Sequence, residues 1–198
     1  MSALLTPPRP APAAHTPARW KWSRADYYRL GECGFFHPKR VELIRGEILE
    51  MSPMGGPHAM SVLLVGDAVA RAFGAGHHAR EEKTLSLPSG EPQPDVAVVR
   101  GAIRDYPDHP TTALLVVEVS DSTLYYDTTT KAELYAEAGI QDYWVLDLNA
   151  RALSVFRGPR RLTPGGHSYQ SETTFGPADS VSPLAAPGAT IRVADLLP

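Results

Sequence analysis

Apolar positions along the chain follow two different patterns. Residues 58–73 carry apolar side chains at helical spacing, and Gly74 and Gly76 follow as stop signals. Residues 95–99 and 114–119 are instead short, continuous apolar runs rich in valine. Such runs are typical of central strands that are buried on both faces. The pattern therefore predicts a long helix followed by a block of buried strands.

The flanking segments predict shorter elements. Ser23 and Asp26 form a capping-box signal for a short helix through Leu30. Residues 41–44 and 47–51 surround a Gly-containing turn, which predicts a hairpin. The remaining predicted elements are a short strand at 84–87, a helix capped by Asp127 or Thr128 and running through Ala138, a hairpin of 143–148 with 152–156, and weak strands near 168–175 and 190–193.

The order of these elements predicts the fold class and the domain organisation. A chain of 198 residues with 43% apolar content is expected to form one domain. Residues 1–18 are rich in Pro and Ala and are expected to be a flexible tail, which leaves residues 19–198 as the folded domain. Helices and strands mix in the order of an α/β or α+β protein, with a mixed central sheet flanked by helices and an N-terminal hairpin. The chain has no Gly-rich phosphate fingerprint between a strand and a helix, which argues against a doubly wound nucleotide fold.

The net charge and the cysteine content exclude some classes of protein and of site. The net charge of −3 argues against tight nucleic-acid binding by the whole surface, although it leaves room for a locally basic cleft. A single cysteine excludes an intrachain disulfide and a Cys-rich zinc site. The apolar runs are too short to span a bilayer, and we find no signal-peptide core, so we expect a cytoplasmic protein.

Two acids stand at the ends of the two buried strands. Asp95 begins the first strand and Glu118 lies near the end of the second. If the strands pair antiparallel, both carboxylates lie at the same edge of the sheet, where they repel each other unless a cation neutralises them. Mg²⁺ prefers oxygen ligands and keeps waters for chemistry, so we expect it between the two acids, with the Val119 carbonyl as a further ligand.

Two more residues are candidates for the same site. Lys131 lies in the first turn of the following predicted helix, from where its ammonium group would orient a water or steady a phosphate. Glu42, from the first hairpin, is a candidate auxiliary acid. Taken singly, Lys131 and Glu42 each have a simpler interpretation as a solvated side chain. Glu118 has no such simple interpretation, because a charge inside an apolar strand is costly unless it is paired or bound to metal.

Other polar residues are candidates for substrate contact. His58, at the start of the long helix, would touch a phosphate or support the site. One locally basic stretch would contact phosphates of DNA or form a solvated loop; it contains Arg151, Arg157, Arg160 and Arg161.

The combination of these segments resembles a known family. Pro94-Asp95 followed by Glu118 resembles the signature of the PD-(D/E)XK nuclease superfamily, which has the restriction-endonuclease-like fold. Over roughly residues 24–195 the chain resembles, more specifically, the bacterial Uma-type restriction endonuclease family. The segments that carry this resemblance are Val41-Glu42-Leu43-Ile44-Arg45-Gly46-Glu47, Met51-Ser52-Pro53, Pro94-Asp95-Val96, Val116-Val117-Glu118-Val119-Ser120, Lys131-Ala132-Glu133-Leu134-Tyr135, and Gly139-Ile140 with Tyr143-Trp144-Val145-Leu146-Asp147.

The resemblance implies roles for individual residues. Asp95 and Glu118 correspond to metal ligands, Lys131 to the catalytic lysine, and Glu42 to an auxiliary acid. The chain departs from the superfamily pattern at Ser120, where the lysine usually stands. The Uma-type family places its lysine on the following helix, as here. The resemblance also implies a homodimer, because cutting both strands of a duplex commonly needs two sites.

The leading hypothesis is therefore a DNA endonuclease that depends on Mg²⁺ or Mn²⁺ and hydrolyses phosphodiester bonds. A second hypothesis is a nucleic-acid-binding or protein-interaction module with a vestigial nuclease site. A third is a structural or homodimeric protein in which the acids are incidental.

Overall fold

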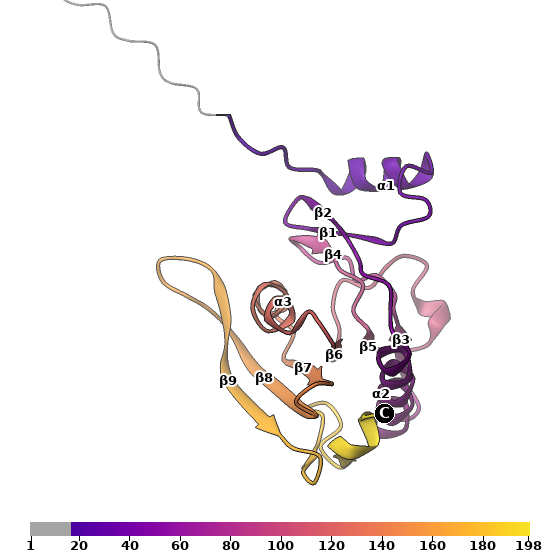
Figure 1. Ribbon diagram of the computed structural model, residues 1–198, viewed down its shortest axis with the longest axis vertical. Helices are drawn as coiled ribbons and strands as arrows, with labels where there is room; N and C mark the ends of the chain where they lie inside the picture. The colour runs from indigo at the N-terminus through magenta and orange to yellow at the C-terminus, as the bar shows by residue number, and fades with distance from the viewer. Residues whose placement is uncertain (1–16) are drawn as a thin grey trace, which may run out of the picture.

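The computed structural model describes residues 17–198 (Figure 1). Most of the predicted tail, residues 1–16, lies outside the described residues. The described helices are α1 (Arg24–Glu32), α2 (Gly56–Phe73), α3 (Leu124–Tyr126), the π-helical segment η2 (Asp127–Lys131), α4 (Ala132–Glu137), and the 3-10 turns η1 (Ile103–Asp105) and η3 (Val193–Leu196). The strands are β1 (Val41–Ile44), β2 (Glu47–Glu50), β3 (His77–Glu81), β4 (Gly90–Glu91), β5 (Val96–Arg100), β6 (Leu115–Ser120), β7 (Asp142–Asp147), β8 (Ala152–Arg161), β9 (His167–Phe175), β10 (Ser180–Val181) and β11 (Ile191–Arg192).

A mixed six-stranded sheet in the order β3-β5-β6-β7-β8-β9 forms the centre of the protein. β6 and β7 are parallel, and the other neighbouring pairs are antiparallel. A smaller sheet, β2-β1-β4, lies with α1 at one end of the molecule, and the long β8–β9 hairpin extends along one side (Figure 1). The predicted mixed sheet with flanking helices and an N-terminal hairpin is confirmed.

The alternation of side chains along β5 and β6 divides the core into two layers. Val96, Val98 and the odd-numbered apolar residues of β6 pack on the face covered by α2, in a cluster that also contains η3. Ala97, Val99 and Val116 pack on the opposite face, against α4. Because side chains alternate with a period of two, Glu118 belongs to the same face as Val116. This face directs the Glu118 carboxylate toward the segment that carries the predicted lysine.

The N-terminal elements form as their local signals predict. Ser23 caps α1 through a complete capping box with Asp26. The β1–β2 turn has Arg45 and Gly46 in the left-handed region, at φ 51° and 78°, as a tight hairpin turn requires. The hydroxyl of Tyr27 donates to the Val41 carbonyl at 2.8 Å, which ties α1 to the hairpin. This arrangement fixes β1 and thereby the position of Glu42.

Two predicted elements are wrong. Residues 84–87 form no regular strand and show only an isolated bridge at Leu87, although Leu85 and Leu87 are fully buried. The edge strand is instead β3, whose partly exposed residues carry no apolar run to reveal it. The helix expected to begin with a cap at Asp127 or Thr128 begins earlier, at Leu124, so Asp127 lies inside the helical segment. Within residues 17–198, none of the helices combines the length and the apolar character that crossing a membrane requires.

Candidate functional site

Asp95 and Glu118 are brought together by the pairing of β5 with β6. These strands are antiparallel with Val96 opposite Val117, so the same register places Asp95, just before β5, opposite Glu118. The backbone N–H of Asp95 donates to Oε2 of Glu118 at 3.3 Å. The N–H of Val119 donates to Oδ2 of Asp95 at 2.6 Å. The antiparallel pairing expected from the sequence is thus confirmed, and both carboxylates are fixed by backbone groups.

Lys131 reaches Glu118 and Glu42 from the helical side. Its Nζ lies 2.9 Å from Oε1 of Glu118 and 3.4 Å from Oε1 of Glu42. The hydroxyl of Tyr135, one turn further along the helix, donates to the same Glu118 oxygen at 2.7 Å. Glu42 is also held by the N–H of Gln93 at 2.6 Å. Lys131 and Glu42 are therefore buried members of the cluster and not solvated side chains.

A π-helical segment carries Lys131. The N–H of Ala132 bonds to the Asp127 carbonyl five residues earlier, and both Asp127 and Lys131 are buried. π-Bulges of this kind are frequent at functional sites. The Asp127 carboxylate accepts hydrogen bonds from Ser120 and Thr123, each at 2.6 Å. Ser120, which stands at the usual superfamily lysine position, thus holds an acid of the helical segment that carries Lys131.

His58 lies beside the acids and supports one of them. It stands in the first turn of α2, and its Nε2 is 3.1 Å from Oδ1 of Asp95. The hydrogen bond to Asp95 raises the pKa of His58 above its usual value, since the carboxylate stabilises the protonated ring. The structure therefore places His58 against an acid of the cluster, from where it orients the carboxylate.

The charges in the cluster do not balance. Burial raises the pKa of Glu118 to about 8, and the negative charges of Asp95, Asp127 and Glu42 add to this effect against the attraction of Lys131. Burial alone would lower the pKa of Lys131, but Glu118, Glu42 and Asp127 hold it well above its usual value. Burial likewise raises the pKa of Asp127. Burial is the main cause of the shifts of the two carboxyl groups, and the surrounding carboxylates are the cause of the raised pKa of Lys131. Both effects favour binding of protons or cations in the cluster.

The acids line a cavity of about 360 Å³ between the hairpin, the start of α2 and the π-helical segment. Among residues 17–198, no three His, Cys, Asp or Glu side chains converge as a complete metal cage. Mg²⁺, however, is commonly held by one or two carboxylates and keeps several waters. The adjacent carboxylates of Asp95 and Glu118, with their excess negative charge, form a donor set of that chemical type.

Three residues beside the cluster are not among the candidates that the sequence offers. The sequence indicates Asp127 only as a helix cap and assigns no role to Tyr126 or Tyr135. Tyr126 lines the cavity, and its hydroxyl is buried without a hydrogen-bond partner among the described residues. The four-residue spacing of Asp127, Lys131 and Tyr135 is the sequence signal that groups two of these residues with Lys131 on the same side of a helix.

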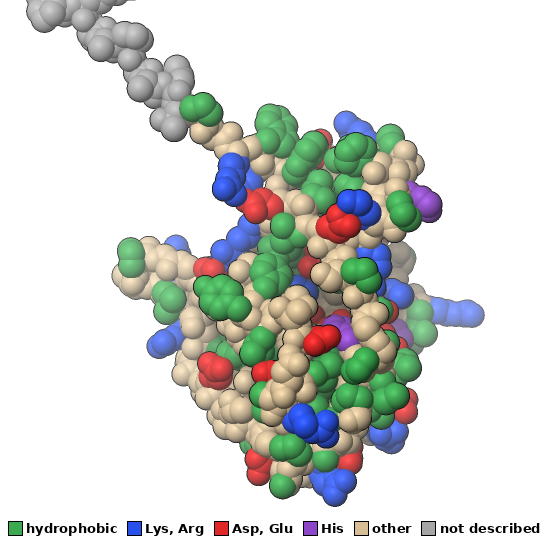
Figure 2. All heavy atoms as spheres, viewed as in Figure 1, with side chains coloured by type: hydrophobic (Ala, Val, Ile, Leu, Met, Phe, Trp, Pro, Cys, Tyr) green, Lys and Arg blue, Asp and Glu red, His purple; other side chains and the backbone are tan. Residues whose placement is uncertain are grey.

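The basic stretch does not act as one group in the structure. Nε of Arg157 donates to the buried Asp142 at 2.9 Å, and its Nη2 donates to the Ser182 carbonyl at 2.7 Å. Nη1 of Arg151 donates to the carbonyl of Pro198 at 3.4 Å, whereas Arg160 and Arg161 are exposed near the far end of β8. None of the four lines the acidic cavity. Basic and acidic side chains are interspersed on the face shown in Figure 2.

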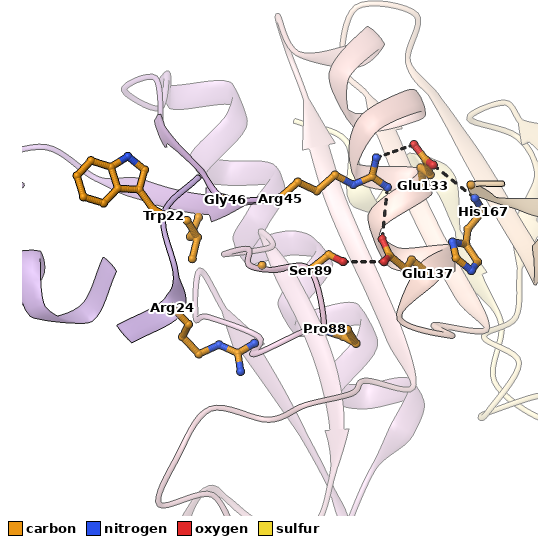
Figure 3. A pocket seen from close by; sticks show the side chains of 12 residues that line it. Trp22, Arg24, Arg45, Gly46, Pro88, Ser89, Glu133, Glu137 and His167 are labelled. Atoms are coloured by element: carbon orange, nitrogen blue, oxygen red, sulfur yellow. Dashed lines mark hydrogen bonds and ion pairs between the residues drawn. The ribbon is translucent and has the colours of Figure 1, made fainter. Parts of the chain in front are cut away.

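A second and larger cavity, of about 710 Å³, lies between the hairpin, α4 and the start of β9 (Figure 3). Arg45 bridges Glu133 at 3.0 Å and Glu137 at 3.4 Å, and the Ser89 hydroxyl donates to Glu137 at 2.6 Å. The carboxylates of this cavity are thus neutralised by an arginine. Arg45 thereby connects the hairpin to α4. Neither Asp95 nor Glu118 lines this second cavity.

Comparisons with known proteins agree with the fold. No curated protein matches the chain. A crystal structure described as a putative nuclease belonging to DUF820, from Anabaena variabilis, superposes with a TM-score of 0.67 at 17% sequence identity. The match covers 87% of this chain and 95% of that one, which shows a shared fold. Residues 24–194 match the sequence family Uma2, described as "Putative restriction endonuclease". This chain belongs to the Uma2 family.

Proposed function

We propose that this protein is a divalent-metal-dependent DNA endonuclease that hydrolyses phosphodiester bonds. The observation that carries the proposal is the convergence of Asp95, Glu118, Lys131 and Glu42 on one cavity. Membership of a family described as restriction endonucleases supports the same reaction class. Asp95 and Glu118, with the Val119 carbonyl, would hold Mg²⁺ or Mn²⁺. The cation would supply a lowered pKa for the attacking water and neutralise charge on the phosphate.

The protein's own groups have distinct tasks in this proposal. Lys131 and Tyr135 fix one oxygen of Glu118, which leaves the other oxygen turned toward Asp95. His58 and the Val119 N–H fix the two oxygens of Asp95. Lys131 is a charged donor beside Glu118 and would orient water or a phosphate oxygen. Preorganised donors of this kind stabilise developing charge without reorganisation during the reaction.

The substrate and assembly are part of the proposal. We propose DNA as the partner, with exposed Arg160 and Arg161 as phosphate contacts at the distal end of β8. Arg151 and Arg157 contribute less to DNA contact, because the structure engages both guanidinium groups within the protein. We also propose a homodimer, which sedimentation analysis of the purified protein would detect.

Cleavage assays test the proposal directly. Purified protein is incubated with supercoiled, linear duplex and single-stranded DNA in the presence of Mg²⁺, Mn²⁺ or EDTA. We expect cleavage that requires the cation and falls at least about 1,000-fold in Glu118→Gln, because the substitution removes a ligand charge while preserving the shape of the side chain. Glu172→Gln, at an exposed position of β9, is the matched control and should cut like the wild type.

Two outcomes would contradict the proposal. Cleavage that persists in Glu118→Gln would place the reaction elsewhere. Failure of the wild type to cut any DNA form with either cation would reject the nuclease assignment. DNA binding without cleavage would then favour the alternative of a nucleic-acid-binding module with a vestigial site.

A further inference from the structure

A third cavity, of about 660 Å³, lies between α1, β3 and the loop of residues 106–111 that follows η1. Arg80 of β3 lines this cavity, together with the side chains of Tyr28 and Tyr106. Among the described residues, Asp108 is the one acid of the lining; it is exposed and forms no ion pair with Arg80. The cavity therefore contains a cation that no neighbouring carboxylate neutralises.

Arg80 differs from the other arginines in its surroundings. Among residues 17–198 two arginines, Arg80 and Arg157, are partly buried, and the others are exposed. Arg157 pairs with the Asp142 carboxylate at 2.9 Å, whereas the Arg80 side chain forms no hydrogen bond and no ion pair with a described residue. Burial lowers the pKa of Arg80, and the opposing contribution comes from Tyr106 and not from a carboxylate. The guanidinium group stays charged near neutral pH, so a bound anion would stabilise it.

The terminal nitrogens of Arg80 are open to a ligand. Nε is buried without a partner, but neither Nη1 nor Nη2 is among the described polar atoms that are both buried and unpartnered. Because these two nitrogens also lack a partner within residues 17–198, they retain accessible surface, and Arg80 lines the cavity. The guanidinium group lies 6.0 Å over the ring centroid of Tyr106, whose hydroxyl donates to the Arg100 carbonyl at 2.8 Å. A fixed ring thus supports one face of the guanidinium group and leaves its terminal N–H groups for a ligand.

Arg80 lies on the same side of the central sheet as the acidic cluster. It pairs with Ala97 across β3 and β5, and Ala97 packs on the face of the sheet to which Glu118 belongs. Glu82, two residues after Arg80, lines the acidic cavity. The Cα atoms of Arg80 and Glu82 are therefore at most about 7 Å apart, which one strand of DNA spans in about two nucleotides. A strand with one phosphate at the acids can thus present a neighbouring phosphate to Arg80.

We propose that Arg80 is a substrate-binding residue that holds a phosphate of the DNA strand a few nucleotides from the bond that is cut. This inference rests on the proposed nuclease function and adds a contact to it. A guanidinium group binds phosphate through two parallel N–H donors, and Nη1 and Nη2 of Arg80 have no acceptor to give up within the described residues. The contact is made to a phosphate and not to a base edge, so it strengthens the binding of every DNA sequence alike.

Arg100 supplies a matched control on the neighbouring strand. It is an exposed residue at the end of β5, its side chain also lacks a partner among the described residues, and it lines none of the three cavities. Alternation along β5 places it with Val98, on the face covered by α2 and away from Glu118. Arg80→Gln and Arg100→Gln each remove one charge without breaking a side-chain hydrogen bond within residues 17–198, so both variants should fold. Arg80→Lys keeps the charge but loses the planar pair of donors.

Fluorescence anisotropy with a labelled oligonucleotide, and Ca²⁺ in place of Mn²⁺, measures DNA binding by the wild type and the three variants. We expect the Kd of Arg80→Gln to rise about 5- to 10-fold, that of Arg80→Lys to rise less, and that of Arg100→Gln to stay within about twofold of the wild type. The slope of log Kd against log salt concentration should fall by about one in Arg80→Gln, because one phosphate contact is lost. In cleavage assays with Mn²⁺, Arg80→Gln should have a raised KM and a kcat within about twofold of the wild type, since the contact is made equally in the ground state and the transition state.

The outcomes separate this inference from the proposed function. Wild-type affinity and salt dependence in Arg80→Gln would overturn the inference about Arg80 and leave the nuclease assignment standing. An equal loss of affinity in Arg100→Gln would also overturn it, because the effect would then reflect total charge and not a contact. If the wild type binds DNA without cutting it, the nuclease assignment fails alone, and a loss of affinity confined to the Arg80 variants still supports the phosphate contact.

Discussion

The burial of Glu118 and the negative charges around it predict an unusual dependence of stability on pH in the metal-free protein. The folded state holds the pKa of Glu118 at about 8, above the ordinary carboxyl value of 4.5. Below pH 4.5 the group is protonated in both the folded and the unfolded state. As the pH rises from 4.5 to 8, the unfolded chain loses this proton while the folded protein keeps it, so the free energy of unfolding decreases. The substitution Glu118→Gln should remove that decrease.

The size of the effect follows from the shift. Each pKa unit corresponds to about 1.4 kcal/mol, so stability lost through Glu118 between pH 5 and pH 8 amounts to at most about 4 kcal/mol. Lys131 leaves this slope unchanged, because its raised pKa keeps it charged throughout that range. His58 and Asp127 also have raised pKa values and change stability in the same direction, but they are present in both proteins. The difference between wild type and variant therefore isolates Glu118.

Urea unfolding at pH 5, 6, 7 and 8 in EDTA measures this difference. We expect Glu118→Gln to have about the wild-type stability at pH 5 and to exceed it progressively toward pH 8. Added Mn²⁺ should raise the stability of the wild type at pH 8 and leave the variant largely unaffected. Parallel pH profiles for the two proteins would refute the reasoning, because they would mean that Glu118 ionises as an ordinary carboxyl group in the folded state.

Two further substitutions test other parts of the structure. Lys131→Met leaves Glu118 and Glu42 buried without their cation. We therefore expect the free energy of unfolding to fall by about 3–5 kcal/mol at pH 8 and by less at pH 5, and we expect no cleavage. An equal fall at both pH values in urea unfolding would contradict this. Asp142→Asn weakens the hydrogen bonds that the fully buried Asp142 carboxylate accepts from Trp144, Arg157 and the Leu184 N–H. We expect thermal or urea unfolding to show about 3 kcal/mol of destabilisation. The control Asp108→Asn, at an exposed position, should cost less than about 0.5 kcal/mol.

Much of the site was predictable because two strands carry it. The apolar runs identified β5 and β6, and their antiparallel pairing forced Asp95 and Glu118 to the same edge. Glu118 was also marked by its position inside an apolar run, where a charge requires a partner. The strands and the marked position of Glu118 follow from continuous apolar runs and from the cost of burying a charge, which are local properties of the sequence. The shared edge also required the assumption that the two strands pair antiparallel.

Other features depended on contacts between distant segments. The partly exposed β3 strand exists because it pairs with β5, and its own residues carry no strand pattern. Arg157 belongs to a basic stretch in sequence, yet its guanidinium group pairs with buried Asp142 from the neighbouring strand. Local patterns could not show these outcomes, because pairing between strands and ion pairing depend on which surfaces the fold brings together.

The sequence by itself determined that one acid begins a buried strand, that another lies near the end of the next, and that a lysine follows on a predicted helix. The pairing of the two strands in the tertiary structure brought the acids together. The tertiary structure decided how that lysine is used. At the end of the π-helical segment, Lys131 is buried against Glu118 and Glu42. A change in helical hydrogen bonding shifts side chains around the helix axis without leaving a mark in the spacing of apolar residues. The fold, and not the motif, therefore sets which donors face the acids.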